Sequence, residues 1–162
     1  MVRLATILLG TMLFAAPVMA QNTDSSSGDA NMEIFIQKIK ADKKLLVASN
    51  MDLNDAEGKK FWPLYDAYQK ELWQINERLE KTISDYAEAY NAGKGMISEE
   101  TAKKLLKEAL SVEEAEVKLK QTYANKIGKV LSATKTARYY QIENKIRTII
   151  KMELVKEIPF VY

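Results

Sequence analysis

The side chains that perform most protein chemistry are absent from this sequence. Its 162 residues include no histidine and no cysteine. Without an imidazole, serine and threonine lack the usual base that activates them as nucleophiles. Zinc and similar metals are normally held by His or Cys, so a zinc or nickel site is poorly supported. The sequence has no glycine-rich phosphate loop either. We therefore expect no enzyme, and no catalytic residue, metal or cofactor.

Glu143 is a carboxylate at the edge of the apolar stripe of the last predicted helix, four residues before Arg147. Acid–base catalysis would need a second positioned group and a pocket, and the sequence indicates neither. We interpret Glu143 as one half of a structural ion pair with Arg138, with Arg147 or with a partner chain.

Basic residues outnumber acidic ones in the same helix. A solvated face is the usual meaning of such a pattern. The alternative is a positive flank that attracts acidic segments of other proteins or lipid headgroups, which makes Arg138 and Arg147 candidate protein-binding residues. The basic residues are Lys135, Arg138, Lys145, Arg147, Lys151 and Lys156.

Aromatic side chains supply the other candidates for protein binding. Trp62 and Trp73 lie 11 residues apart on one predicted helix. At about 100° per residue they point within about 20° of each other, some 100° from the main apolar seam of that helix. They either pack beneath the first helix or in a dimer, or form an exposed strip for other proteins. Tyr140, beside Tyr139, is a further candidate.

The first 20 residues have the pattern of a secretory signal peptide. Arg3 precedes a nearly uncharged apolar run from Leu4 to Val18. The stretch ends with Val18-Met19-Ala20, which places small residues at the positions that a signal peptidase reads, so we expect cleavage before Gln21. The run is shorter than the roughly 20 residues that span a bilayer, so we expect no stable membrane anchor after cleavage. Residues 21–30 are a flexible polar spacer, and 31–162 form a single helical domain.

Capping residues and apolar periodicity predict four helices. Asn54 and Glu57 form the pattern of a capping box, while Ser98 and Ser132 are further N-caps. Gly93 and Gly95 end the second helix, and Pro159 ends the fourth. The predicted helices cover residues 32–49, 54–91, 98–130 and 132–157.

Two long apolar seams predict how the helices pack. One runs from Phe61 to Ala89 in steps of three and four; the other runs from Leu105 to Val130, with a polar interruption at Glu116. A second apolar sector lies about 100° around the third helix; it contains Leu106, Leu110, Val117 and Ala124. The second helix would be roughly 55 Å long, too long for a compact sphere. We expect an all-α, elongated antiparallel hairpin of four helices that forms a curved homodimer.

A short motif occurs at two helix starts, 78 residues apart. Leu53, Asn54 and Glu57 form the first copy, and Leu131, Ser132 and Lys135 form the second. Each copy is followed by a basic residue, an aromatic pair and an aliphatic residue, as in Lys60-Phe61-Trp62 and Arg138-Tyr139-Tyr140.

This repeat resembles the Spy/CpxP-like family of periplasmic proteins, whose hallmark is a pair of Leu-Thr-x-x-Gln motifs at helix starts. The resemblance covers roughly residues 53–155. Asn54 and Ser132 replace threonine and are good caps, and Glu57 keeps the capping geometry of glutamine, whereas Lys135 departs from it. The resemblance implies long, curved helical dimers that act as ATP-independent chaperones or as accessory inhibitors of envelope-stress sensor kinases.

We therefore expect a periplasmic protein-binding protein, either a holdase-type chaperone for unfolded clients or an envelope-stress accessory protein. The alternative is a structural or regulatory adaptor for one envelope partner, with its aromatics simply in the core. The totals of 24 basic and 22 acidic residues become 23 and 22 once Arg3 is removed with the leader. Such a balance gives little attraction to DNA, so no nucleic-acid partner is expected.

Overall fold

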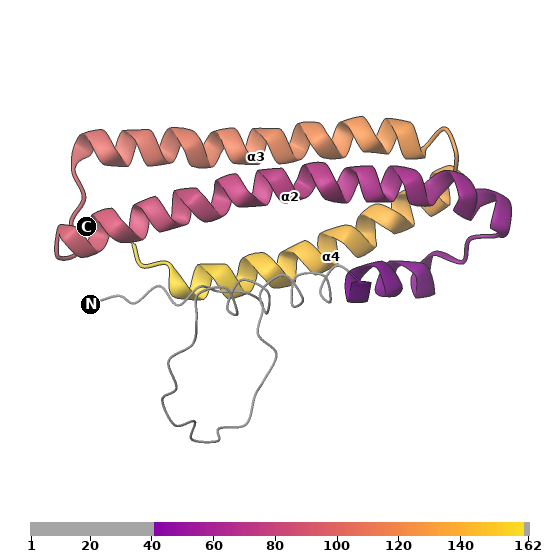
Figure 1. Cartoon of the computed structure of the whole chain (residues 1–162), viewed down its shortest axis with the longest axis horizontal. Helices are drawn as coiled ribbons and strands as arrows, with labels where there is room; N and C mark the ends of the chain where they lie inside the picture. The colour runs from indigo at the N-terminus through magenta and orange to yellow at the C-terminus, as the bar shows by residue number, and fades with distance from the viewer. Residues whose placement is uncertain (1–40, 161–162) are drawn as a thin grey trace, which may run out of the picture.

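A computed structural model describes residues 41–160 of the chain (Figure 1). The predicted signal peptide, the predicted spacer and the first part of the first predicted helix lie outside these residues. The described part contains four helices and no strand, which confirms the all-α class. They are the N-terminal helix (residues 41–51), α2 (Asp55–Ala92), α3 (Glu99–Ile127) and α4 (Ala133–Glu157).

The three predicted N-caps are confirmed. Asn54 Oδ1 accepts the Glu57 N–H at 3.0 Å, while Glu57 Oε2 accepts the Asn54 N–H at 3.0 Å, so α2 begins with a complete capping box. Ser98 Oγ accepts the Thr101 N–H, and Ser132 Oγ accepts the Lys135 N–H. These bonds satisfy backbone donors that have no partner inside a helix, and they fix where each helix begins.

Two helix ends differ from the sequence prediction. The N-terminal helix continues past Ser49 to Met51, whose side chain is fully buried, and it stops at Asp52, which has a left-handed φ of 47°. The third helix ends at Ile127 rather than Val130. Glycine has a low helix propensity, so Gly128 weakens the helix at this point. After Gly128 the chain turns back, and the Leu131 N–H donates to the Ile127 carbonyl.

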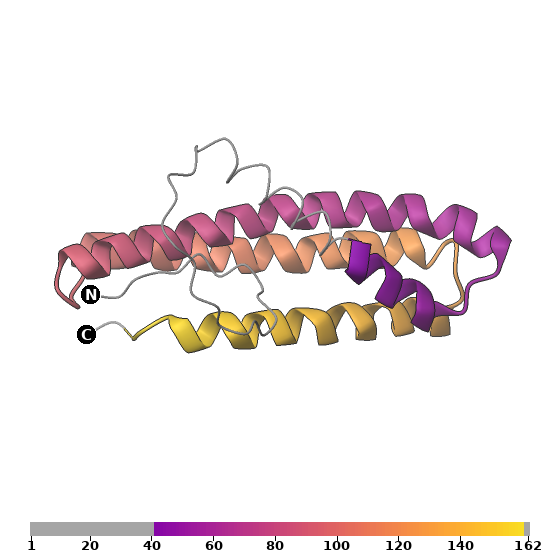
Figure 2. The same cartoon turned by 60° about the horizontal axis from the view of Figure 1, so that its bottom comes forward.

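Both views place α2 and α3 side by side along their lengths, joined by the turn around Gly93 and Gly95 (Figures 1 and 2). The predicted seams face the inside. On α2 the buried residues include Phe61, Tyr65, Tyr68 and Leu72, and on α3 every third or fourth residue from Leu105 to Ile127 is buried or half-buried. The periodicity therefore predicted the packing faces of both helices.

The main core lies at one end of the molecule, where α2 and α4 begin and α3 ends. Its centre is a set of aromatic rings in edge-to-face contact, with Tyr139 5.2 Å from Phe61 and Tyr68 5.4 Å from Tyr123 between ring centroids. Val47 and Met51 of the N-terminal helix cover this cluster, and neither side chain has any exposed surface. The aromatic cluster thus joins all four helices. We use the name aromatic cluster for these rings together with the aliphatic side chains that are buried around them. Its buried members are Val47, Met51, Phe61, Tyr65, Tyr68, Leu72, Leu119, Tyr123, Ile127, Leu131 and Tyr139.

Candidate functional site

The two copies of the repeated motif meet in space. Lys135 Nζ lies 2.6 Å from Glu57 Oε2 and also donates to the Asp52 carbonyl oxygen at 2.7 Å. Leu131 is buried in the aromatic cluster, and Leu53 packs against it. The hydrogen bond from Lys135, with that from the Asn54 backbone, lowers the pKa of Glu57. The motif residues thus tie the end of the N-terminal helix to the starts of α2 and α4.

Trp62 is half-buried on the aromatic cluster. Its ring centroid lies 5.0 Å from that of Phe61 and 5.4 Å from that of Tyr65, both edge-to-face. Lys44 of the N-terminal helix places its ammonium 5.4 Å from the Trp62 ring centroid, at cation–π distance. Trp62 therefore packs beside the first helix, which was one of the two interpretations of the sequence.

Trp73 lies farther along α2 and is also half-buried. Its indole Nε1 donates to Glu77 Oε1 at 3.0 Å. The two tryptophans therefore sit in different surroundings, Trp62 among rings and Trp73 beside a carboxylate.

Tyr140 is half-buried, and its ring contacts Tyr139 and Tyr68 with centroids 5.0 and 6.4 Å apart. Its hydroxyl is buried and has no hydrogen-bond partner among residues 41–160; the hydroxyl of Tyr68 is in the same state. Burial, with a smaller contribution from the Glu143 charge, raises the pKa of Tyr68, Tyr139 and Tyr140. These phenols stay protonated and act as packing groups.

Glu143 is fully buried between three helices. Lys43 Nζ lies 2.6 Å from Glu143 Oε1 and also donates to Gln69 Oε1 at 2.9 Å, while Gln69 Nε2 donates to Glu143 Oε2 at 3.3 Å. Burial lowers the pKa of Lys43, although the Glu143 charge opposes this. The prediction of an ion pair is confirmed, but the prediction of its partner was wrong: it is Lys43, not Arg138 or Arg147.

Arg147 belongs to a second buried ion pair, with Glu116 of α3. Arg147 Nε donates to Glu116 Oε1 at 2.8 Å, and its Nη2 donates to Oε2. Lys120 and Lys151 also lie near this carboxylate, at 2.8 and 3.3 Å. Burial works against ionisation of Glu116, but Arg147 and Lys120 outweigh it and lower its pKa to about 2. The polar interruption seen in the sequence is therefore an interhelical anchor, and Arg147 is engaged inside the bundle.

Arg138 is exposed, in contrast to Arg147. It lines a groove of about 340 Å³ between the end of the N-terminal helix and α4. Sequence reasoning gave the basic residue but not this groove, because the groove forms only when Asn50 is brought beside α4. The lining residues are Asn50, Arg138, Gln141, Ile142 and Lys145.

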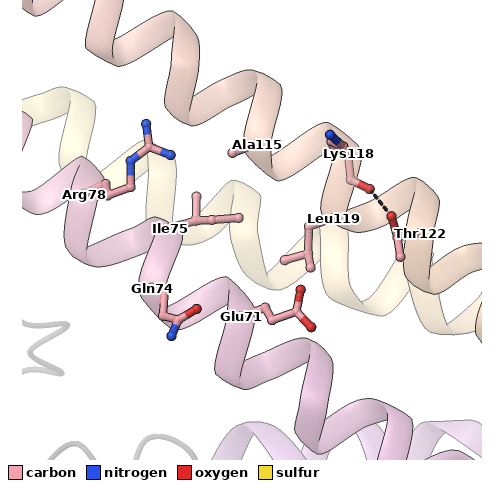
Figure 3. Close-up of a pocket in the computed structure, with 8 residues that line it drawn as sticks. All are labelled: Glu71, Gln74, Ile75, Arg78, Ala115, Lys118, Leu119 and Thr122. Atoms are coloured by element: carbon pink, nitrogen blue, oxygen red, sulfur yellow. Dashed lines mark hydrogen bonds between the residues drawn. The ribbon is translucent and has the colours of Figure 1, made fainter.

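A second groove, of about 400 Å³, runs between α2 and α3 (Figure 3). Ile75 and Leu119 point into the space between the helices, and polar side chains surround them. Arg78 donates to Glu108 at 2.8 Å and to Ser111 at 2.9 Å, and Glu71 accepts from the Tyr123 hydroxyl at 2.6 Å. Because these charged groups already bond within the chain, we assign no chemistry to this groove.

Large apolar side chains remain exposed in two rows. On α3, Leu106, Leu110 and Val117 are 61, 56 and 53% exposed. On α4, Ile149 and Met152 are 57 and 53% exposed. The α3 row is the second apolar sector expected from the sequence. The sequence analysis did not predict the α4 row, although two apolar residues three positions apart lie on the same side of a helix and could have indicated it.

The described residues hold no group of three or more acidic side chains that could bind a metal ion. Within residues 41–160, none of the helices combines the length and apolar character needed to cross a bilayer. Comparisons of the chain with protein-family models, with curated proteins and with solved structures gave no match.

Proposed function

We propose that this protein is a periplasmic protein-binding protein of Spy/CpxP-like architecture, acting as an ATP-independent holdase-type chaperone or as an envelope-stress accessory protein. The signal-peptide pattern supports export through residues 1–20. The ion pair between Glu57 and Lys135 supports treating the two motif copies as one structural unit. The elongated hairpin and the homodimer are parts of this proposal.

The observation that carries the proposal is the pair of exposed apolar rows on α3 and α4. Eight large apolar side chains among residues 41–160 are more than half exposed, and five of them lie in these two rows. Rows of this kind beside polar residues are typical of surfaces that contact other proteins. The rows consist of Leu106, Leu110, Val117, Ile149 and Met152.

The α3 row fits a second copy of the same chain. If two α3 helices pair antiparallel about an axis near Ser111, Leu106 lies opposite the partner's Val117, and Lys107 lies beside the partner's Glu114. In this register Leu110 lies opposite the partner's Glu113, so the apolar contacts are the two Leu106–Val117 pairs, and the two Lys107–Glu114 pairs add opposite charges on either side of the axis. This assigns the α3 row to the homodimer and leaves the α4 row for other proteins.

The alternative function is a structural or regulatory adaptor for one envelope partner. The half-buried state of Trp62 and Tyr140 favours it, because both aromatics then serve the core alone. Cross-linking in intact cells, followed by identification of the captured proteins, distinguishes the two functions. A chaperone is captured with many unrelated envelope proteins, whereas an adaptor is captured with one. Capture of a single partner, together with failure to prevent aggregation in vitro, would reject the chaperone.

A further inference from the structure

The basic residues of α4 fall into two groups. Lys135 is bound by Glu57, and both Arg147 and Lys151 contact Glu116. Arg138 and Lys145 are exposed, and neither has an ion-pair partner in the part of the chain that the structure describes. Among the basic side chains of α4 that the structure describes, the unneutralised charge therefore lies at these two residues.

Arg138 and Lys145 both line the 340 Å³ groove beside the N-terminal helix. Ile142, half-buried on the aromatic cluster, gives the groove an apolar part. Asn50 supplies an acceptor: its Nδ2 donates to the Leu46 carbonyl at 2.8 Å and to Ser49 Oγ at 3.2 Å, so its Oδ1 is left to accept. Gln141 adds an exposed amide. The groove thus offers two cations, hydrogen-bond acceptors and an apolar contact.

The exposed apolar row of α4 continues from this groove along one face. At about 100° per residue, Arg138, Lys145, Ile149 and Met152 fall within about 60° of one another, and they span roughly 21 Å of the helix. An extended peptide advances about 3.3 Å per residue, so about six residues would cover that distance. Within residues 138–152 the face is basic at its beginning and apolar toward its end.

We propose that this face of α4 binds extended segments of other proteins that are acidic at one end and apolar at the other. The carboxylate pairs with Arg138 and Lys145 in the groove, and the apolar side chains cover Ile149 and Met152. This inference rests on the proposed protein-binding function and names the class of segment that is bound.

An anionic membrane surface fits the same face less well. Each basic residue contributes only about 1 kcal/mol to binding at an anionic bilayer, so peripheral binding usually needs a cluster of four or more. Among the α4 side chains that the structure describes, two are unneutralised. Asn50 Oδ1 can accept a hydrogen bond from a peptide backbone N–H. It cannot form a hydrogen bond with an ionised lipid phosphate oxygen, because both atoms are acceptors. The groove chemistry favours a peptide.

The test uses the full mature chain and a short fluorescein-labelled peptide in which adjacent aspartates precede leucines. Fluorescence anisotropy measures its Kd for the wild type and for the double variant R138Q/K145Q. The matched control is K59Q/K60Q, which removes the same charge from two exposed lysines of α2. We expect R138Q/K145Q to weaken binding about five- to tenfold and the control to leave it unchanged, since exposed pairs contribute modestly. Replacing the aspartates by asparagines should produce the same loss with wild-type protein.

Equal weakening by both double variants would mean that only net charge matters, and it would overturn the assignment of the groove. So would an unchanged Kd for R138Q/K145Q. The variant I149S/M152S should weaken the leucine peptide but not a serine analogue, and an equal effect on both would contradict the apolar half. Flotation with phosphatidylglycerol vesicles should recover no protein. If the wild type instead floats with the vesicles and R138Q/K145Q does not, the face would be assigned to lipid. Failure of the wild type to prevent aggregation, together with capture of a single partner, would reject the chaperone, while the peptide titration judges the groove separately.

Discussion

The carboxylate of Glu57 and the ammonium of Lys135 meet at 2.6 Å although 78 residues separate them. They occupy the same position in two copies of one motif, and each copy starts a helix. The same lysine holds the Asp52 carbonyl at the end of the N-terminal helix. One ion pair thus sets three helix ends against one another at the edge of the aromatic cluster.

Variants that remove either charge of this pair should lower the melting temperature, and the double variant should lower it by less than the sum of the two single effects. Glu57→Gln keeps the acceptor of the capping box but removes its charge, and Lys135→Gln removes the other charge. We expect each single variant to melt below the wild type and the double variant to melt close to the single variants, since all three lose the same interaction. Circular dichroism melts of the four proteins measure this coupling. Fully additive shifts would show that the two motifs do not act together.

The capping box itself makes a separate contribution. Asn54→Ala removes the side-chain acceptor for the Glu57 N–H and should destabilise the protein by about 1 kcal/mol. Asn54→Ser should retain most of the stability, because serine caps helices nearly as well as asparagine. Urea unfolding compares the two variants. Equal losses in both would contradict the capping role.

The buried pair of Lys43 and Glu143 holds the N-terminal helix to α4. Lys43→Met leaves a fully buried carboxylate without its cation and should cost about 3 kcal/mol. The double variant K43M/E143L should recover most of that loss, because apolar side chains can replace the pair. The control K44M breaks an exposed pair with Asp66 and should cost less than about 1 kcal/mol. Equal costs for K43M and K44M would contradict the account of Glu143.

Glu116 should make the stability of the protein fall in acid. Its folded pKa is about 2, below the ordinary value of 4.5, so the folded state binds fewer protons than the unfolded state between these values. The stabilisation is complete above about pH 4.5 and is lost as the pH falls toward 2, with a magnitude on the order of 3 kcal/mol. The free-energy difference between wild type and E116Q should therefore shrink over this window in urea titrations. A difference that stays constant from pH 7 to pH 3 would contradict the ionised pair.

The proposed dimer predicts a change of mass on disrupting the α3 row. Leu110→Glu places a charge at the centre of the row and should convert a dimer into a monomer in sedimentation equilibrium. Met96→Glu alters an equally exposed apolar residue outside the row and should leave the dimer intact. A monomeric wild type would overturn the assignment of this row.

Local signals allowed the sequence to predict the helices well. Asn54, Ser98 and Ser132 are recognisable caps because their bonds reach only three residues along the chain. The seam from Phe61 to Leu72 was visible because burial repeats with the helix period. The early end of α3 was missed because Gly128 sits within an unbroken apolar pattern and the turn depends on docking Leu131 in the core.

Charge partners were beyond the sequence because they depend on which helices face each other and in what register. Glu116 stood out as an interruption in a seam, yet nothing local pairs it with Arg147, 31 residues away. Glu143 was expected to pair with Arg138, with Arg147 or with a partner chain, but its ion-pair partner is Lys43 of the N-terminal helix, 100 residues away. The groove beside Asn50 depends on the same docking.

The central claim, that the protein holds other proteins through its exposed apolar surface, is tested most directly by light scattering. Two unrelated denatured clients are diluted into buffer without ATP, with and without the mature protein at near-equimolar concentration. We predict suppression of aggregation for both clients, with weaker suppression by I149S/M152S. Scattering that rises equally with and without the protein, for both clients, would contradict the chaperone function.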